Sequence, residues 1–206
     1  MTIIIIVVTI LVSILAFSNQ SMMDKLDFSP YRTIHSKEWH RLVTHGFVHA
    51  DYIHLFVNMF VLMSFGTAVE SIFKSLAYSG IIQNATLHFS ALYFGGIIIA
   101  SLTTLKKYKD NYYYHSVGAS GAVSAIVFTY IFFDPLGKLL FMFIVPIPAI
   151  VFGIAYLAYS YYMSKKEGDH INHDAHFVGS IFGFIYPLLI DPKLIFVFLE
   201  KLGIIH

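Results

Sequence analysis

Six apolar runs, separated by polar segments, make up most of the chain. A transmembrane helix needs about 20 mostly apolar residues to cross a hydrocarbon core of roughly 30 Å, and each run approaches that length. The pattern predicts a single integral membrane domain over residues 1–206, an all-α bundle of six transmembrane helices. The predicted spans are residues 2–17, 53–73, 84–105, 116–133, 139–163 and 174–190.

The polar segments mark where these runs end. Asp134-Pro135-Leu136-Gly137 is a turn signal after the fourth run, and Asp191-Pro192 ends the sixth. No Lys or Arg precedes the first run, so we expect it to be retained rather than cleaved as a signal peptide. Residues 18–52 mix charges with aromatic side chains, which predicts a long first loop lying in the headgroup interface.

The composition favours a membrane protein. Of the 206 residues, 57% are hydrophobic and only 12% are Asp, Glu, Lys or Arg, about half the charged fraction of a soluble domain. The chain has no cysteine, which excludes thiol catalysis and Cys-ligated zinc. Its net charge of +1 gives no indication of nucleic-acid binding. The 11 histidines are the remaining unusual feature.

A few polar residues lie inside predicted spans, where their cost makes them candidates for function. His54 and Asn58 are one turn apart at the start of the second span, while Ser120 and His176 lie near the starts of the fourth and sixth. Alternating crossings place these three starts on the same membrane face. The sequence therefore predicts the four side chains at one shallow level.

Glycines accompany the serine and the histidine. At 100° per residue, His176, Gly179 and Gly183 fall within about 60° of one another, and Gly118 and Gly121 flank Ser120. Small residues let helix backbones approach closely. We therefore expect His176 to face a neighbouring helix.

These residues predict a serine hydrolase. His176 can accept the Ser120 hydroxyl proton and pass it to a leaving amine. His54, Asn58 and the Ser120 backbone N–H are candidate donors to the oxyanion. Asp174 is two residues from His176 and on the wrong face to orient it, so we predict a Ser/His dyad rather than a triad.

In their order and spacing, several segments over about residues 37–190 resemble the rhomboid family of intramembrane serine proteases, in its minimal six-helix bacterial form. The matching segments are Trp39-His40-Arg41, His49 followed by His54-Leu-Phe-Val-Asn58, Gly66-Thr-Ala-Val-Glu70, Gly118-Ala119-Ser120-Gly121, and Ala175-His176-Phe177-Val178-Gly179 with Gly183.

The resemblance implies cleavage of single-span membrane proteins within or near the lipid, without a metal or another cofactor. Ser120 would be the nucleophile and His176 the general base, with His54 and Asn58 lining the oxyanion hole. The resemblance also implies that His49 is a buried organiser of the first loop. Arg41 and Glu70 would be structural, as would the glycines of the two motifs.

The chain departs from the family pattern at three places. His40 separates Trp39 from Arg41, and Lys74 stands where many members have a further glycine. Many members place a tyrosine four residues after the serine, where its ring packs on the catalytic histidine. This chain has Ser124 there, so the orientation of His176 depends on another group.

The loop charges and the resemblance favour opposite orientations. With the predicted site outside, the outer loops hold nine Lys and Arg residues and the inner side holds four, against the positive-inside rule. The resemblance places the active site towards the non-cytoplasmic face of the bacterial inner (cell) membrane. We adopt that orientation because early spans can fix topology.

Two other functions stay open. A catalytically idle rhomboid-like protein would bind membrane partners without cutting them, although Ser120 and His176 argue against it. A small polytopic transporter would have interrupted helices near the midplane, which the prolines at residues 146 and 148 support slightly. His45 and His49 have a spacing that suits a metal, but the sequence lacks the HExxH pattern of a zinc protease.

Overall fold

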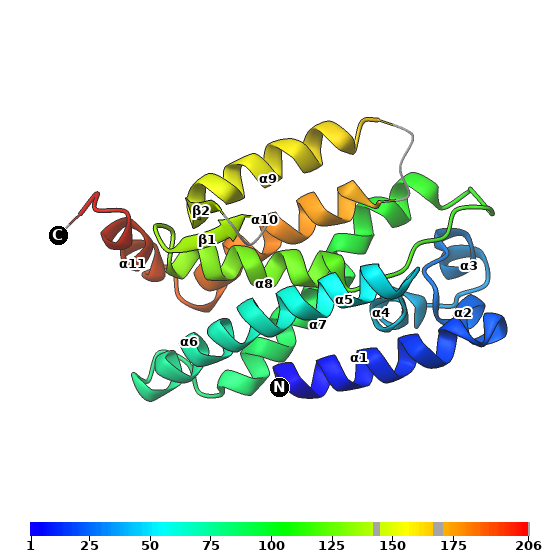
Figure 1. The fold of residues 1–206 in the computed structure, drawn as a ribbon, viewed down its shortest axis with the longest axis horizontal. Coiled ribbons are helices and arrows are strands. Elements are labelled where there is room, and N and C mark those ends of the chain that lie inside the picture. Colours follow the sequence, from blue (N-terminus) through cyan, green and yellow to red (C-terminus); the bar gives the residue numbers. More distant parts are fainter. Residues whose placement is uncertain (142–144, 167–170, 206) are drawn as a thin grey trace.

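The computed structural model describes residues 1–141, 145–166 and 171–205, and most of them are helical. Long helices lie side by side through the molecule (Figure 1). The first run forms α1 (Thr2–Phe17), and the second forms α5 (Tyr52–Val61), a π-helical turn η2 (Leu62–Gly66) and α6 (Thr67–Tyr78). The later helices are α7 (Ala85–Tyr108), α8 (Ser120–Phe133), α9 (Ala149–Met163), α10 (His173–Ile190) and α11 (Leu194–Lys201).

Two helices in the described part of the chain are long and apolar enough to cross a membrane. They are the continuous helix Tyr52–Tyr78 and α7. Helices α1, α8 and α9 are apolar but shorter.

The fifth apolar run differs from the predicted helix over residues 139–163, because it does not begin as a helix. Its first part is a hairpin in which β1 (Lys138–Phe141) pairs antiparallel with β2 (Val145–Pro148), and α9 begins only at Ala149. A proline inside a helix removes a hydrogen bond and clashes with the preceding turn, so Pro146 and Pro148 favour extended chain. The prediction of an all-α chain is therefore wrong over this hairpin.

The first loop is folded rather than irregular. It contains α2 (Gln20–Leu26), α3 (Pro30–His35), α4 (Arg41–Thr44) and the 3-10 turn η1 (His45–Phe47). Phe28 of this loop and Ser116 exchange two backbone hydrogen bonds, of 2.9 and 3.0 Å. Because this bridge holds residue 116 in extended chain, α8 begins at Ser120 and not at residue 116.

Helix α8 lies inside the bundle, with α7 and α10 beside it (Figure 1). Glycines bring α8 and α10 into backbone contact. A methyl group at Gly179 would overlap the carbonyl oxygen of Gly121, and one at Gly183 would overlap that of Ala125. This contact fixes the start of α10 against the start of α8.

Candidate active site

Ser120 is the first residue of α8, and a tight turn precedes it. Gly118 has a φ of +115°, which favours glycine, and its N–H donates to the His45 carbonyl at 2.9 Å. A Cβ at Gly118 would lie 2.6 Å from Cε1 of His54. The imidazole of His54 therefore packs directly against the turn that presents Ser120.

His49 holds the other side of this turn. Its side chain is fully buried, and its Nε2 accepts a hydrogen bond from the backbone N–H of Ala119 at 3.4 Å. Its Nδ1 lies 3.0 Å from Oγ of Ser13, and that hydroxyl donates to the Phe47 carbonyl at 2.9 Å. Since Ser13 uses its one proton on Phe47, His49 must be the neutral tautomer that donates from Nδ1.

His45 and His49, the two buried histidines next to the turn, are held neutral. Burial lowers the pKa of His45 to about 4, and burial together with the neighbouring His54 lowers the pKa of His49 to about 3. A neutral imidazole can accept a hydrogen bond, as His49 does from the Ala119 N–H. A protonated ring cannot accept one, because both of its nitrogens are donors. The turn that precedes Ser120 therefore packs against two uncharged histidines.

His176 lies in the first turn of α10, three residues before Gly179. Its ring stacks on Tyr156 of α9, with centroids 6.2 Å apart and planes 22° apart, and meets the edge of His173 at 5.9 Å. The Gly121–Gly179 contact sets the turn that carries His176 beside the turn that carries Ser120. The structure thus brings the helix starts that carry the two predicted catalytic residues together.

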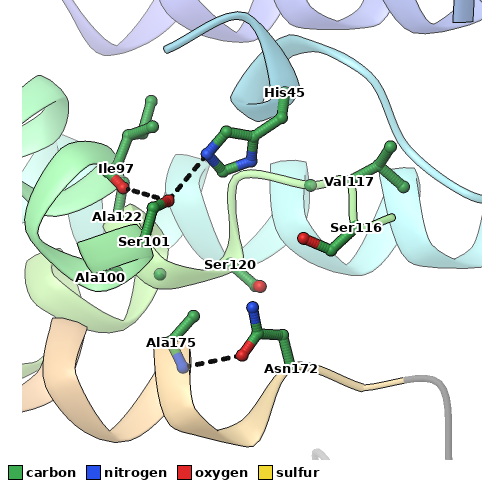
Figure 2. A pocket seen from close by; sticks show the side chains of 12 residues that line it. His45, Ile97, Ala100, Ser101, Ser116, Val117, Ser120, Ala122, Asn172 and Ala175 are labelled. Carbon is green, nitrogen blue, oxygen red and sulfur yellow. Dashed lines mark hydrogen bonds between the residues drawn. The ribbon is translucent and has the colours of Figure 1, made fainter. Parts of the chain in front are cut away.

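A cavity of about 20 Å³ lies beside Ser120. Figure 2 shows the Ser120 side chain and Asn172 facing it, with His45 and Ser101 on the opposite side. Ser101 lies 3.0 Å from Nε2 of His45 and donates to the Ile97 carbonyl at 2.8 Å. The lining thus includes polar side chains beside apolar ones.

The remaining predicted site residues are dispersed around this centre. Asn58 is buried one turn after His54, and its amide donates to the His54 carbonyl at 2.9 Å. Arg41 is buried in the first loop, where it pairs with Asp27 and Glu38. Glu70 lies further along the same long helix as Asn58 and accepts hydrogen bonds from the N–H and hydroxyl of Thr2.

Sequence reasoning did not single out three residues at the site: Asn172, Ser101 and Tyr156. Asn172 caps α10, accepting from the Ala175 N–H at 3.1 Å, and bonds Thr104 at 2.9 Å. An asparagine just before a helical run is a cap signal that could have identified it. Nothing in the sequence pattern indicates that Tyr156 meets His176, because that depends on how α9 packs.

The fold and the site define a mostly helical protein that has two helices long and apolar enough to cross a membrane, and a serine and a histidine at neighbouring helix starts. A family model, the Rhomboid domain, matches residues 36–193, and the chain belongs to the rhomboid family.

Two curated relatives carry rhomboid names. The chain is 29% identical to "RHOMBOID-like protein 12, mitochondrial" from Arabidopsis thaliana over 168 residues, covering 80% of this chain and 50% of that protein. It is also 29% identical to "Rhomboid protein 1, mitochondrial" from Saccharomyces cerevisiae over 149 residues, covering 70% of this chain and 40% of that protein. The chain thus spans half or less of these relatives. Their mitochondrial names give no support to the expected bacterial membrane.

Proposed function

We propose that this protein is an intramembrane serine endopeptidase that cleaves single-span membrane proteins with a Ser120/His176 dyad. The carrying observation is the backbone contact between Gly121 and Gly179, which holds the helix start of Ser120 against that of His176. Family membership supports the same reading.

The proposed reaction begins with attack of the Ser120 Oγ on the scissile carbonyl while His176 accepts its proton. The proton then passes from His176 to the leaving amine, which leaves an acyl-enzyme on Ser120. Water attacks this ester, with His176 again accepting a proton. The acyl C–O bond then breaks as His176 returns this proton to the Ser120 Oγ, and the second product leaves as a carboxylic acid that ionises in water.

The start of α8 suits the negative charge that develops on the substrate oxygen. The first N–H groups of a helix have no partner within it, and they point towards its positive end. The Ser120 N–H is one of these, and His54 packs against the adjacent Gly118. We assign His54, Asn58 and the Ser120 N–H to the oxyanion hole, where one donor is worth roughly 3 kcal/mol.

The cavity beside Ser120 suits the water that the second step needs. One water requires at least about 10–15 Å³ and two to four polar partners. The cavity measures about 20 Å³, and Ser101, Ser116 and Asn172 contribute polar groups to its lining. We propose that this cavity binds the water molecule that later attacks the acyl-enzyme.

We further propose that the chain crosses the membrane six times, with α1, the long helix Tyr52–Tyr78, α7, α8, α9 and α10 as the spans. The starts of α5, α8 and α10 then share one face, which we assign to the non-cytoplasmic side. Many outward side chains of α1 and α5 are apolar and exposed, including Ile4, Leu11, Ile53 and Phe56. Lipid would cover such surfaces.

A fluorophosphonate probe tests the dyad because it forms a covalent bond only with an activated serine. The purified protein in detergent should be labelled at Ser120, as located by mass spectrometry. Labelling should be absent in Ser120→Ala, fall at least about 100-fold in His176→Ala, and persist in Ser64→Ala, where an exposed serine is removed. A folded wild-type protein that resists the probe would favour an idle rhomboid-like binder and contradict the proposal.

A further inference from the structure

The inference concerns Tyr156, on α9, and it rests on the proposed function. We propose that Tyr156 is the positioning residue for His176, in place of the tyrosine that many rhomboids carry four residues after the serine. In this chain that position is Ser124, whose Oγ lies 3.0 Å from the Tyr156 hydroxyl oxygen. The ring and the serine thus form one unit that spans α8 and α9.

The contact between the two rings carries the proposal. The His176 ring stacks on the Tyr156 ring, with centroids 6.2 Å apart and planes 22° apart, a separation within the usual range for stacked aromatic pairs. This contact limits the rotation of the imidazole.

Tyr156 is itself held in place. Its ring stacks on Phe152, one turn earlier on α9, with centroids 5.7 Å apart, and meets Phe128 of α8 at 6.0 Å. Ser124, which fixes the hydroxyl end, is only 6% exposed. The three aromatic rings of Phe152, Tyr156 and His176 therefore form a continuous stack from α9 to α10.

The start of α9 is anchored close to the end of α8. The N–H of Ala149 donates to the Gly137 carbonyl, and that of Ile150 donates to the Pro135 carbonyl, both at 2.8 Å. The position of Tyr156 is thus set by α9, a helix that carries none of the predicted catalytic residues. The orientation of His176 follows from how α9 packs.

Steady-state cleavage of a single-span model substrate tests the proposal. Tyr156→Ala should lower kcat by about 10- to 100-fold with little change in KM, because the base loses its alignment. Tyr156→Phe keeps the ring and loses the hydroxyl that bonds Ser124, so its kcat should fall by about 5-fold. Tyr162→Ala is the matched control, since Tyr162 is exposed on the same helix and should leave both constants unchanged.

A rescue separates positioning from simple stability. Ser124→Tyr combined with Tyr156→Ala restores the arrangement common in the family and keeps one ring in the space between α8 and α10. This double variant should regain most of the kcat lost by Tyr156→Ala. If Tyr156→Ala does not fold, Tyr156→Leu, which fills part of the same volume, takes its place in both comparisons.

Three outcomes would overturn the positioning role while the proposed function stands. They are unchanged kcat in Tyr156→Ala, a loss expressed only in KM, and no rescue by a folded double variant. The proposed function fails separately, if the wild-type protein neither cleaves the substrate nor reacts with a fluorophosphonate at Ser120.

Discussion

The histidines around Ser120 have different proposed roles. His49 is fully buried and accepts from the Ala119 N–H, whereas His54 is only partly buried and packs against Gly118. The buried ring supports the backbone of the turn. In the proposed mechanism, the partly buried ring of His54 donates to the oxygen of the substrate carbonyl.

Replacing His49 should affect stability more than turnover. His49→Ala leaves the Ala119 N–H without its acceptor, removes the hydrogen bond that the Ser13 Oγ accepts and opens a cavity, which should cost about 3 kcal/mol. Asn58→Ala, by contrast, should lower turnover by roughly 100-fold through loss of an oxyanion donor. Thermal unfolding in detergent and kcat for both variants check this, and the reverse pattern would exchange the two assignments.

The buried histidines also predict a dependence of stability on pH. Their pKa values fall from 6.5 to about 4 for His45 and about 3 for His49 on folding. Between these values the unfolded chain binds protons that the folded chain does not. Stability is therefore complete above about pH 6.5 and falls as the pH drops towards 4, by about 1.4 kcal/mol per pH unit for each histidine.

Thermal midpoints in detergent at pH 7.5 and pH 5.0 measure this dependence. His45→Gln removes one of the two buried groups, so the difference between its midpoints should be smaller than that of the wild-type protein. His40→Gln, which replaces an exposed histidine, should keep the wild-type difference. Equal differences in all three proteins would show that burial of His45 does not control the titration.

Among the elements, the contact between α8 and α10 matters most for the site. It depends on glycine, because the backbones touch at Gly121 with Gly179 and at Ala125 with Gly183. A side chain at Gly179 or Gly183 would meet backbone atoms of α8, which cannot rotate away as a side chain can. The helices would have to separate, and the helix starts carrying Ser120 and His176 would separate with them.

Gly179→Ala should therefore lower both stability and activity. We expect a loss of about 2 kcal/mol, typical of overpacking, and a fall in kcat of roughly 100-fold from misplacement of His176. Gly95→Ala on α7 is the control because its methyl group meets only the ring end of Phe182, at 3.0 Å. Similar behaviour of the two variants would mean that the α8–α10 contact has no special role.

At the scale of the whole molecule, the second, third and fourth of the six proposed crossings can be tested by introduced cysteines, since the chain has none of its own. Trp39, Tyr78, Tyr113 and Leu136 are exposed and lie in or next to successive connecting segments. In sealed vesicles, a membrane-impermeant maleimide should label cysteines at 39 and 113 from one side. Those at 78 and 136 should react from the other, and any exchange between the sets would contradict the topology.

The sequence predicts much of this arrangement and misses particular parts of it. The helix Thr2–Phe17 has the predicted bounds because no charged residue or proline interrupts its run. The hairpin before α9 was missed because its apolar residues resemble a helical run, although Pro146 and Pro148 exclude one. In the first loop, Asn19 and Ser29 cap the starts of two short helices. A hydrophobicity pattern alone does not predict helices this short.

The candidate site shows the same division. Ser120, His176, His54 and Asn58 could be proposed from the sequence because polar residues in apolar helices stand out, and their roles stay predictions. Tyr156 could not, since a tyrosine in an aromatic-rich helix has no distinguishing pattern and lies 20 residues from His176 in the chain. Its contact depends on the rotation of α9, which only the packed molecule determines.

The most direct test of the proposed protease activity is cleavage in a membrane. The wild-type protein and Ser120→Ala are reconstituted into liposomes with a single-span substrate, and the products are identified by mass spectrometry. The wild-type protein should cut within or near the transmembrane segment of the substrate, and Ser120→Ala should fold with an unchanged thermal midpoint and leave the substrate intact. Cleavage by Ser120→Ala at the wild-type rate would contradict the dyad and the function built on it.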